Sequence, residues 1–183
     1  MKPHKTAVRP QRNGFSLIEV LVAVAVVSVG IMGLALTYGD GVKTATGAQF
    51  GYVAQKKAEE AMEAIFTARD TKILKWADIQ NVSNGGVFMD GPQPMLVPGP
   101  DGLVGTQSDL GSAPEVYTVN AGPDGVLGTA DDVTYPLSFM TRTIQITNIQ
   151  NEPNLRMITV TINYTVQGRG GQYVLVTYVS AFA

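Results

Sequence analysis

The stretch GFSLIEVLVAVAVVSVGIMGLAL, residues 14–36, decides the fold of the first part of this chain. It contains no proline, and Glu19 is its single charged residue. About 20 apolar residues in a helix that rises 1.5 Å per residue span about 30 Å, the thickness of the hydrocarbon core of a bilayer. The stretch therefore predicts a membrane-spanning helix over residues 15–38. Inserting its one carboxylate costs about 2.5–3.5 kcal/mol unless another group pairs with it.

The residues before the apolar run carry only positive charge, from Lys2, Lys5, Arg9 and Arg12. The positive-inside rule then predicts a cytoplasmic N-terminus and a remainder outside the cytoplasm. That remainder is more acidic than the formal charge of −2 for the whole chain, which argues against an autonomous nucleic-acid binder. A secretory signal peptide and a plain single-pass anchor are the alternatives. The apolar run exceeds the 7–15 residues of a signal-peptide centre, and neither alternative accounts for Glu19.

The composition removes several kinds of catalytic site. The chain has no cysteine, and its only histidine, His4, lies in the basic leader. This excludes disulfides and thiol chemistry, and it leaves no side chain for His-based triads or the usual zinc sites. No pair of acidic residues stands in a recognisable catalytic setting. We therefore predict a structural protein and not an enzyme.

A basic leader that ends in Gly14 and continues as FSLIEVLVA resembles the class III signal of type IV pilins and pseudopilins. Within that family the helix looks most like that of PilV-type minor pilins. The resemblance implies that a prepilin peptidase removes residues 1–14 and methylates the amine of Phe15. It also implies that Glu19, the fifth residue of the processed chain, meets the N-terminal amine of a neighbouring subunit. Such a pairing neutralises an acid that is costly alone in lipid, and it sets the register between subunits.

Residues 39–70 are predicted to continue the helix as an amphipathic half. Lys56 and Lys57 stand near three glutamates, which indicates a solvated charged face. The opposite face is an apolar stripe at three- and four-residue spacings, which predicts packing against a globular head. The members of the stripe are Val53, Ala54, Ala58, Ala61, Met62, Ile65 and Phe66.

The last part of the chain, residues 136–183, predicts an antiparallel sheet. Apolar residues alternate with polar ones from Ile158 to Val166, QGRGGQ is typical of a turn, and YVLVTYVSAFA is typical of a returning strand. Residues 71–135 lack such a pattern and predict a loop-rich region, with Trp76 as a packing anchor. The fold class is therefore α+β: a long N-terminal helix packed on a small antiparallel head, as in pilins.

The loop-rich region contains a duplicated motif. GPDGLVGTQSDL begins at Gly99 and GPDGVLGTADDV begins at Gly122. Calcium takes six to eight oxygen ligands from carboxylates, carbonyls and water, and glycine-rich turns can direct such oxygens inward. The alternative is an ordinary Pro-Asp-Gly turn. The second copy is a possible calcium site, and the first is a weaker one with fewer carboxylates. The candidate ligands are Asp124, Thr129, Asp131 and Asp132 in the second copy and Asp101 and Asp109 in the first.

Together these features predict a minor type IV pilin. It would be a precursor in the cytoplasmic membrane and then a subunit of a cell-surface pilus. Its expected partners are the prepilin peptidase, the pilus assembly machinery and other pilin subunits, with no direct contact to nucleic acid. Three alternatives stay open at this point: a pseudopilin of a type II secretion system, a membrane-anchored calcium-binding adhesin that does not polymerise, and the major subunit of the filament.

Overall fold

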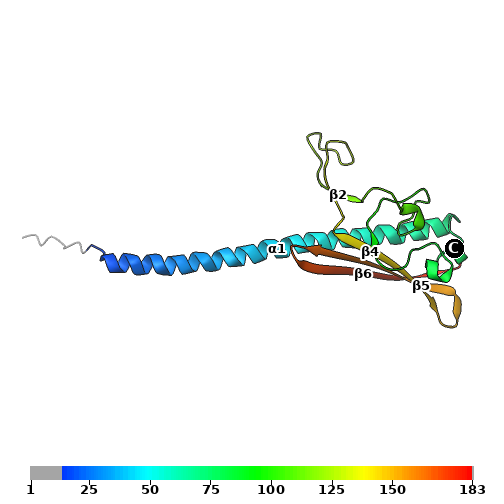
Figure 1. Cartoon of the computed structure of the whole chain (residues 1–183), viewed down its shortest axis with the longest axis horizontal. Helices are drawn as coiled ribbons and strands as arrows, with labels where there is room; N and C mark the ends of the chain where they lie inside the picture. The colour runs from blue at the N-terminus through cyan, green and yellow to red at the C-terminus, as the bar shows by residue number, and fades with distance from the viewer. Residues whose placement is uncertain (1–13, 183) are drawn as a thin grey trace, which may run out of the picture. The chain divides into compact units, whose positions relative to one another are not determined.

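The structure is a computed structural model that describes residues 14–182. One continuous helix, α1 (Leu17–Asp70), begins the described chain, and the strands follow it (Figure 1). The chain divides after Lys43 into an N-terminal unit and a second compact unit, Thr44–Ala183, which we call the head. The two units are described separately below.

The head contains a four-stranded antiparallel sheet in the order β1–β4–β5–β6. The predicted alternation on β5 is confirmed, because Ile158, Val160 and Ile162 are all fully buried. The predicted α+β class, a long helix packed on a small antiparallel sheet, is therefore confirmed as well. The four strands are β1 (Gln93–Pro94), β4 (Met140–Ile149), β5 (Glu152–Val166) and β6 (Arg169–Ser180).

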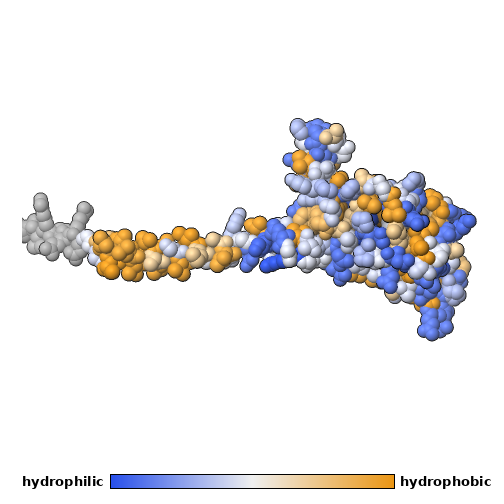
Figure 2. Space-filling model, viewed as in Figure 1, coloured by the Kyte–Doolittle hydropathy of each residue, from blue (hydrophilic) through white to orange (hydrophobic). Residues whose placement is uncertain are grey.

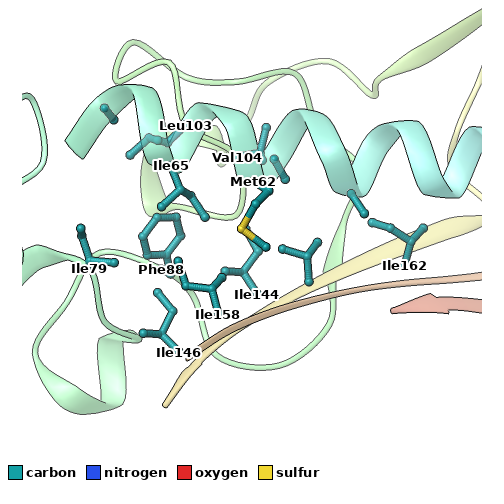
Figure 3. Packing of buried hydrophobic residues seen from close by; sticks show 14 of the residues in the cluster. Met62, Ile65, Ile79, Phe88, Leu103, Val104, Ile144, Ile146, Ile158 and Ile162 are labelled. Atoms are coloured by element: carbon teal, nitrogen blue, oxygen red, sulfur yellow. The ribbon is translucent and has the colours of Figure 1, made fainter. Parts of the chain in front are cut away.

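The core of the head lies between the second half of α1 and the sheet. Met62 and Ile65 of α1 point toward Ile144 and Ile158 of the sheet, as Figure 3 shows. The predicted apolar stripe is thus the buried face of the helix. Its small members let the sheet approach the helix backbone closely, because an alanine adds only one methyl group between them. These fully buried alanines are Ala54, Ala58 and Ala61.

A two-residue turn joins β5 to β6. Gln167 and Gly168 both have positive φ, of 50° and 77°, which is the backbone of the tight turns that favour hairpins. The turn is shorter than predicted, because Arg169 already belongs to β6. Gly171 pairs with Tyr164 across the hairpin, and a Cβ at Gly171 would lie 2.3 Å from the Tyr164 ring. Only glycine fits there without moving the aromatic side chain.

The region before the sheet holds more regular structure than its sequence predicts. Besides β1, it contains a separate antiparallel ribbon of β2 (Val116–Asn120) and β3 (Val133–Pro136). Tyr117 of β2 packs against the core, and the loop between the two strands extends away from the rest of the head in Figure 1. Short 3₁₀ turns link these pieces. They are η1 (Trp76–Asp78), η2 (Val82–Asn84) and η3 (Gln107–Asp109).

Polar side chains attach the region after α1 to the sheet. The Asn81 amide donates to the carbonyl of Ile144 at 2.8 Å, and its oxygen accepts the Ile146 amide at 2.8 Å, so it extends the edge of β4. Arg156 of β5 donates to the carbonyls of Trp76 and Ile79, and its guanidinium lies 4.1 Å from the centre of the Trp76 ring. Burial lowers the pKa of Arg156. Trp76 packs on the core, in its expected role as an anchor.

Candidate functional site

The residues that the sequence links to processing and assembly lie at the start of α1. Gly14 and Phe15 precede the helix and are both exposed. The Ser16 hydroxyl accepts the backbone N–H of Glu19 at 3.2 Å, and the Ser16 carbonyl accepts the same N–H at 3.1 Å. Ser16 is therefore the N-cap of α1, and Glu19 occupies the third position of the first turn. The leader, residues 1–13, lies outside the described residues.

The capping role of Ser16 was not predicted, although its signal is present in the sequence. Serine followed three residues later by glutamate, ahead of an apolar run, is the pattern of a capping box. A carboxylate in the first turn also interacts favourably with the positive end of the helix dipole. Glu19 therefore has a local stabilising role besides any role in assembly.

The Glu19 carboxylate has no hydrogen-bond or ion-pair partner among residues 14–182. It is the only charged side chain between Leu17 and Leu36. An unpaired carboxylate on a helix that enters lipid or a packed bundle is energetically unfavourable. Its position leaves it open to a cation supplied from outside the described chain.

The helix around Glu19 presents a predominantly apolar surface, which is mostly orange in Figure 2. Fourteen large apolar residues between Phe15 and Leu36 are more than half exposed. Burying each is worth at least 1.5 kcal/mol, so covering all of them is favourable by on the order of 20 kcal/mol. Among the described residues, α1 is long and apolar enough to cross a membrane. This surface requires lipid or other helices around it.

Two hydroxyl groups of this segment are satisfied within the helix. The Ser28 hydroxyl donates to the carbonyl of Val24 at 2.7 Å, and the Thr37 hydroxyl donates to that of Gly33 at 2.9 Å. Such bonds remove the cost of placing a hydroxyl in an apolar medium. Gly30 and Gly33 have no atom within 4 Å of a built Cβ, so nothing in the described chain requires glycine there. Small residues of this kind permit close approach of another helix.

In the first copy of the duplicated motif, the two aspartates cap backbone amides. Asp109 is buried and accepts the N–H groups of Gly99, Gly105 and Thr106 at 2.6–3.1 Å. Asp101 accepts the N–H of Leu103 at 3.1 Å and the Thr106 hydroxyl at 2.8 Å. Both oxygens of each carboxylate are thus engaged by the loop itself.

In the second copy, the four predicted ligands lie close together in the loop between β2 and β3. Thr129 donates to Asp131 at 2.6 Å, while Asp124 accepts the N–H of Val126 at 2.8 Å and Asp132 accepts that of Gly128 at 2.7 Å. The Thr129 hydroxyl and the Asp124 amide lower the pKa of Asp131. No group of three or more acidic or histidine side chains placed to hold a metal occurs among residues 14–182. The carboxylates accept hydrogen bonds from backbone amides of the turn, and calcium binding stays a prediction.

One charged cluster in the head was not predicted. Glu115 accepts Arg142 at 2.7 Å and Lys57 at 3.0 Å, and the Glu115 and Arg142 side chains are 7% and 3% exposed. Lys57 also pairs with the exposed Glu60 at 2.8 Å. The prediction of a solvated face is therefore wrong for Lys57. Burial lowers the pKa of Lys57, but the bonds to Glu60 and Glu115 outweigh it, so the pKa is raised. Nothing in the local sequence around Glu115 or Arg142 indicates this partnership.

A scan against protein families matches one model, the prokaryotic N-terminal methylation motif, at residues 9–35. No curated protein and no solved structure matches the chain. The matched residues include the Gly14–Phe15 junction, the Ser16 cap and Glu19. They end within the exposed apolar part of α1. The match does not extend to the head, and it does not distinguish PilV-type minor pilins from other classes. The chain thus carries a prepilin-type N-terminal motif on a long apolar helix, which makes it similar to type IV pilin-like proteins.

Proposed function

We propose that this chain is a minor type IV pilin, a structural subunit of a cell-surface filament. Its precursor is held in the cytoplasmic membrane by the segment of residues 15–38. Prepilin peptidase cuts after Gly14 and methylates Phe15, and the assembly machinery then packs the helix among other pilin helices. In the packed state Glu19 pairs with the N-terminal amine of a neighbouring subunit.

The observation that carries this proposal is the combination at the start of α1. The methylation motif at residues 9–35 coincides with a helix whose apolar side chains are uncovered and whose one carboxylate lacks a partner within the described chain. A plain membrane anchor requires neither the junction residues nor the acid. A filament of packed helices accounts for the apolar surface and the acid, because neighbouring helices cover the surface and supply a cation to Glu19. Processing before assembly accounts for the junction residues.

The substitution Glu19→Gln separates the two roles of this residue. Glutamine has a similar shape and leaves the Ser16 cap on the backbone N–H of residue 19 in place, but it carries no charge. We expect Glu19→Gln to be cleaved normally and to enter filaments poorly. Ser16→Ala is the matched control, because it removes the cap and keeps the carboxylate. If Ser16→Ala reduces incorporation as strongly as Glu19→Gln does, the effect comes from the helix start and not from pairing.

Intact-mass spectrometry of filament and membrane fractions tests the processing step. We expect the filament fraction to contain a chain that begins at methylated Phe15, and Gly14→Ala to leave the full-length precursor in the membrane. A full-length chain that is confined to the membrane would favour the anchored calcium-binding adhesin. A processed chain that depends on a type II secretion gene set, and not on a pilus gene set, would favour the pseudopilin.

A further inference from the structure

We propose that the loop between β2 and β3, residues 121–132, is a docking element that places Val126 and Leu127 in the cleft beside Trp76 on the head of a second copy of this chain. The inference concerns contacts between heads only. It does not depend on cleavage after Gly14 or on the pairing of Glu19.

The two copies of the duplicated motif share two contacts between an aspartate and a backbone amide, although only the first copy contains a 3₁₀ turn, η3. In the first copy, Asp101 accepts the N–H of Leu103, and in the second copy Asp124 accepts the N–H of Val126. The later carboxylates correspond too: Asp109 accepts the Gly105 amide at 2.6 Å, and Asp132 accepts the Gly128 amide at 2.7 Å. The first copy therefore shows how an apolar pair held in this loop can be used.

The apolar pairs of the two copies differ in burial. Leu103 and Val104 of the first copy are 2% and 7% exposed, and they belong to the core of the head. Val126 and Leu127 of the second copy are 56% and 70% exposed. The loop that carries them extends away from the head in Figure 1, and Figure 2 shows apolar and polar residues side by side on it. Among the described residues, no part of the chain buries Val126 and Leu127 as the core of the head buries Leu103 and Val104.

The exposed pair is held on an ordered turn. The Thr129 hydroxyl donates to Asp131 at 2.6 Å and lies 3.0 Å from the carbonyl of Val126, and Asp124 and Asp132 accept the N–H groups of Val126 and Gly128. A loop that is ordered before binding loses less conformational entropy on binding than a flexible loop does. The turn therefore presents Val126 and Leu127 ready for contact.

The charges of the loop define the chemistry of its partner. Residues 121–132 contain Asp124, Asp131 and Asp132 and no basic residue. An apolar tip surrounded by carboxylates is complementary to an apolar cleft with basic side chains, and like charges across such a contact would oppose it.

The head itself contains such a cleft, of about 340 Å³, where α1 ends. Arg69 is paired with Asp70, but no carboxylate within the described chain lies at ion-pair distance from Lys72 or Lys75. Three other clefts of the head each include acidic side chains, which would repel the loop. The residues that line the basic cleft are Arg69, Lys72, Leu74, Lys75, Trp76 and Ala181.

The loop and the cleft are different parts of one head, so their contact is heterologous. Each copy that offers its loop to one neighbour keeps its own cleft available for another. Contacts of this type continue from copy to copy unless the rotation between copies closes a ring.

The absence of cysteine makes disulfide trapping a direct test. The chain with Leu127→Cys and Ala181→Cys, which places a thiol in the cleft lining and keeps its basic side chains, would be oxidised in isolated membranes and separated without reductant. Because a disulfide requires Cα atoms within about 7 Å, only a close contact is trapped. Leu127→Cys with Gln145→Cys is the matched control, since Gln145 is exposed on β4 and lies away from the cleft lining. Resistance to trypsin would show that the heads are folded.

We expect dimers and higher multiples from the first pair, several-fold above the control, with a lower yield at high salt because screening weakens the ionic contribution. Equal yields from the two pairs in folded protein would overturn the proposal. A crosslink from the thiol of Leu127→Cys to a different protein, without self-crosslinks, would overturn it as well, because the loop would then serve another partner.

Discussion

The buried carboxylate of Glu115 supports a quantitative prediction about the stability of the head. Glu115 directly precedes β2, and its carboxylate contacts Lys57 on α1 at 3.0 Å and Arg142 on β4 at 2.7 Å. It therefore links three elements. Glu115→Gln keeps the shape of the side chain and removes its charge. The guanidinium of Arg142 then stays buried without an opposite charge.

The expected loss follows from the burial of both partners. Removing one member of a buried ion pair costs about 3–5 kcal/mol, mostly because the other charge is left without compensation. With a urea dependence of about 2 kcal/mol per molar, the midpoint of unfolding should fall by roughly 1.5–2.5 M. Glu60→Gln is the matched control. Glu60 also contacts the ammonium group of Lys57, at 2.8 Å, but the Glu60 side chain is 60% exposed. An exposed pair is worth about 0–1 kcal/mol.

Urea unfolding of the full chain in mild detergent, followed by the fluorescence of Trp76, the only tryptophan, measures both variants. Midpoints for Glu115→Gln and Glu60→Gln that agree within about 0.5 M would refute the reasoning, since burial would then not decide the cost. A double variant, Glu115→Leu with Arg142→Met, should recover most of the loss, because a buried pair replaced by apolar groups is often neutral in stability.

Four further outcomes are expected. Gly171→Ala should lower the melting temperature, because the added methyl group would collide with the Tyr164 ring. Gly170→Ala should have little effect, because no atom lies within 4 Å of a Cβ at that position. Asp109→Asn should cost about 1–3 kcal/mol through lost acceptors for buried amides, and Asp132→Asn, on the exposed loop, should cost less; equal losses would contradict the difference in burial. Because the pKa of Lys57 is raised on folding, its charged form stabilises the head fully below the unfolded pKa of 10.5, and this stabilisation is lost as pH rises through the folded pKa. The urea midpoint of unfolding should therefore fall above about pH 10.5, and it should fall less with pH in Lys57→Met. If the second Gly/Asp loop holds calcium, calcium should raise the melting temperature and Asp131→Ala with Asp132→Ala should abolish the rise; the same melting temperature in calcium and in chelator would identify these residues as turn formers.

Local patterns in the sequence predicted the elements that local forces determine. The buried face of α1 and the inward face of β5 follow from periodicity, because each side chain's direction is set by the helix or strand that carries it. Ser16 and Glu19 also form a local pattern, S-x-x-E, that indicates the start of a helix. These features needed no knowledge of distant residues.

The features that were missed depend on contacts between distant parts of the chain. Glu115 and Arg142 are 27 residues apart, and Asn81 reaches Ile144 and Ile146 more than 60 residues away. Strands β2 and β3 are short and mostly exposed, so they lack the apolar alternation that indicates a strand. The two Gly/Asp copies show the same limit, because their sequences agree while the surroundings decide which apolar pair is buried.

The N-cap at Ser16 has a consequence for the processed chain that we propose. Cleavage before Phe15 replaces a neutral peptide bond with an ammonium group one residue ahead of the cap. That cation then lies at the positive pole of α1, where a positive charge is unfavourable by about 0.3–1 kcal/mol. The cut therefore creates a repulsion that the precursor does not have. A carboxylate from an adjoining helix would relieve this repulsion, so processing would make association with a neighbouring subunit more favourable.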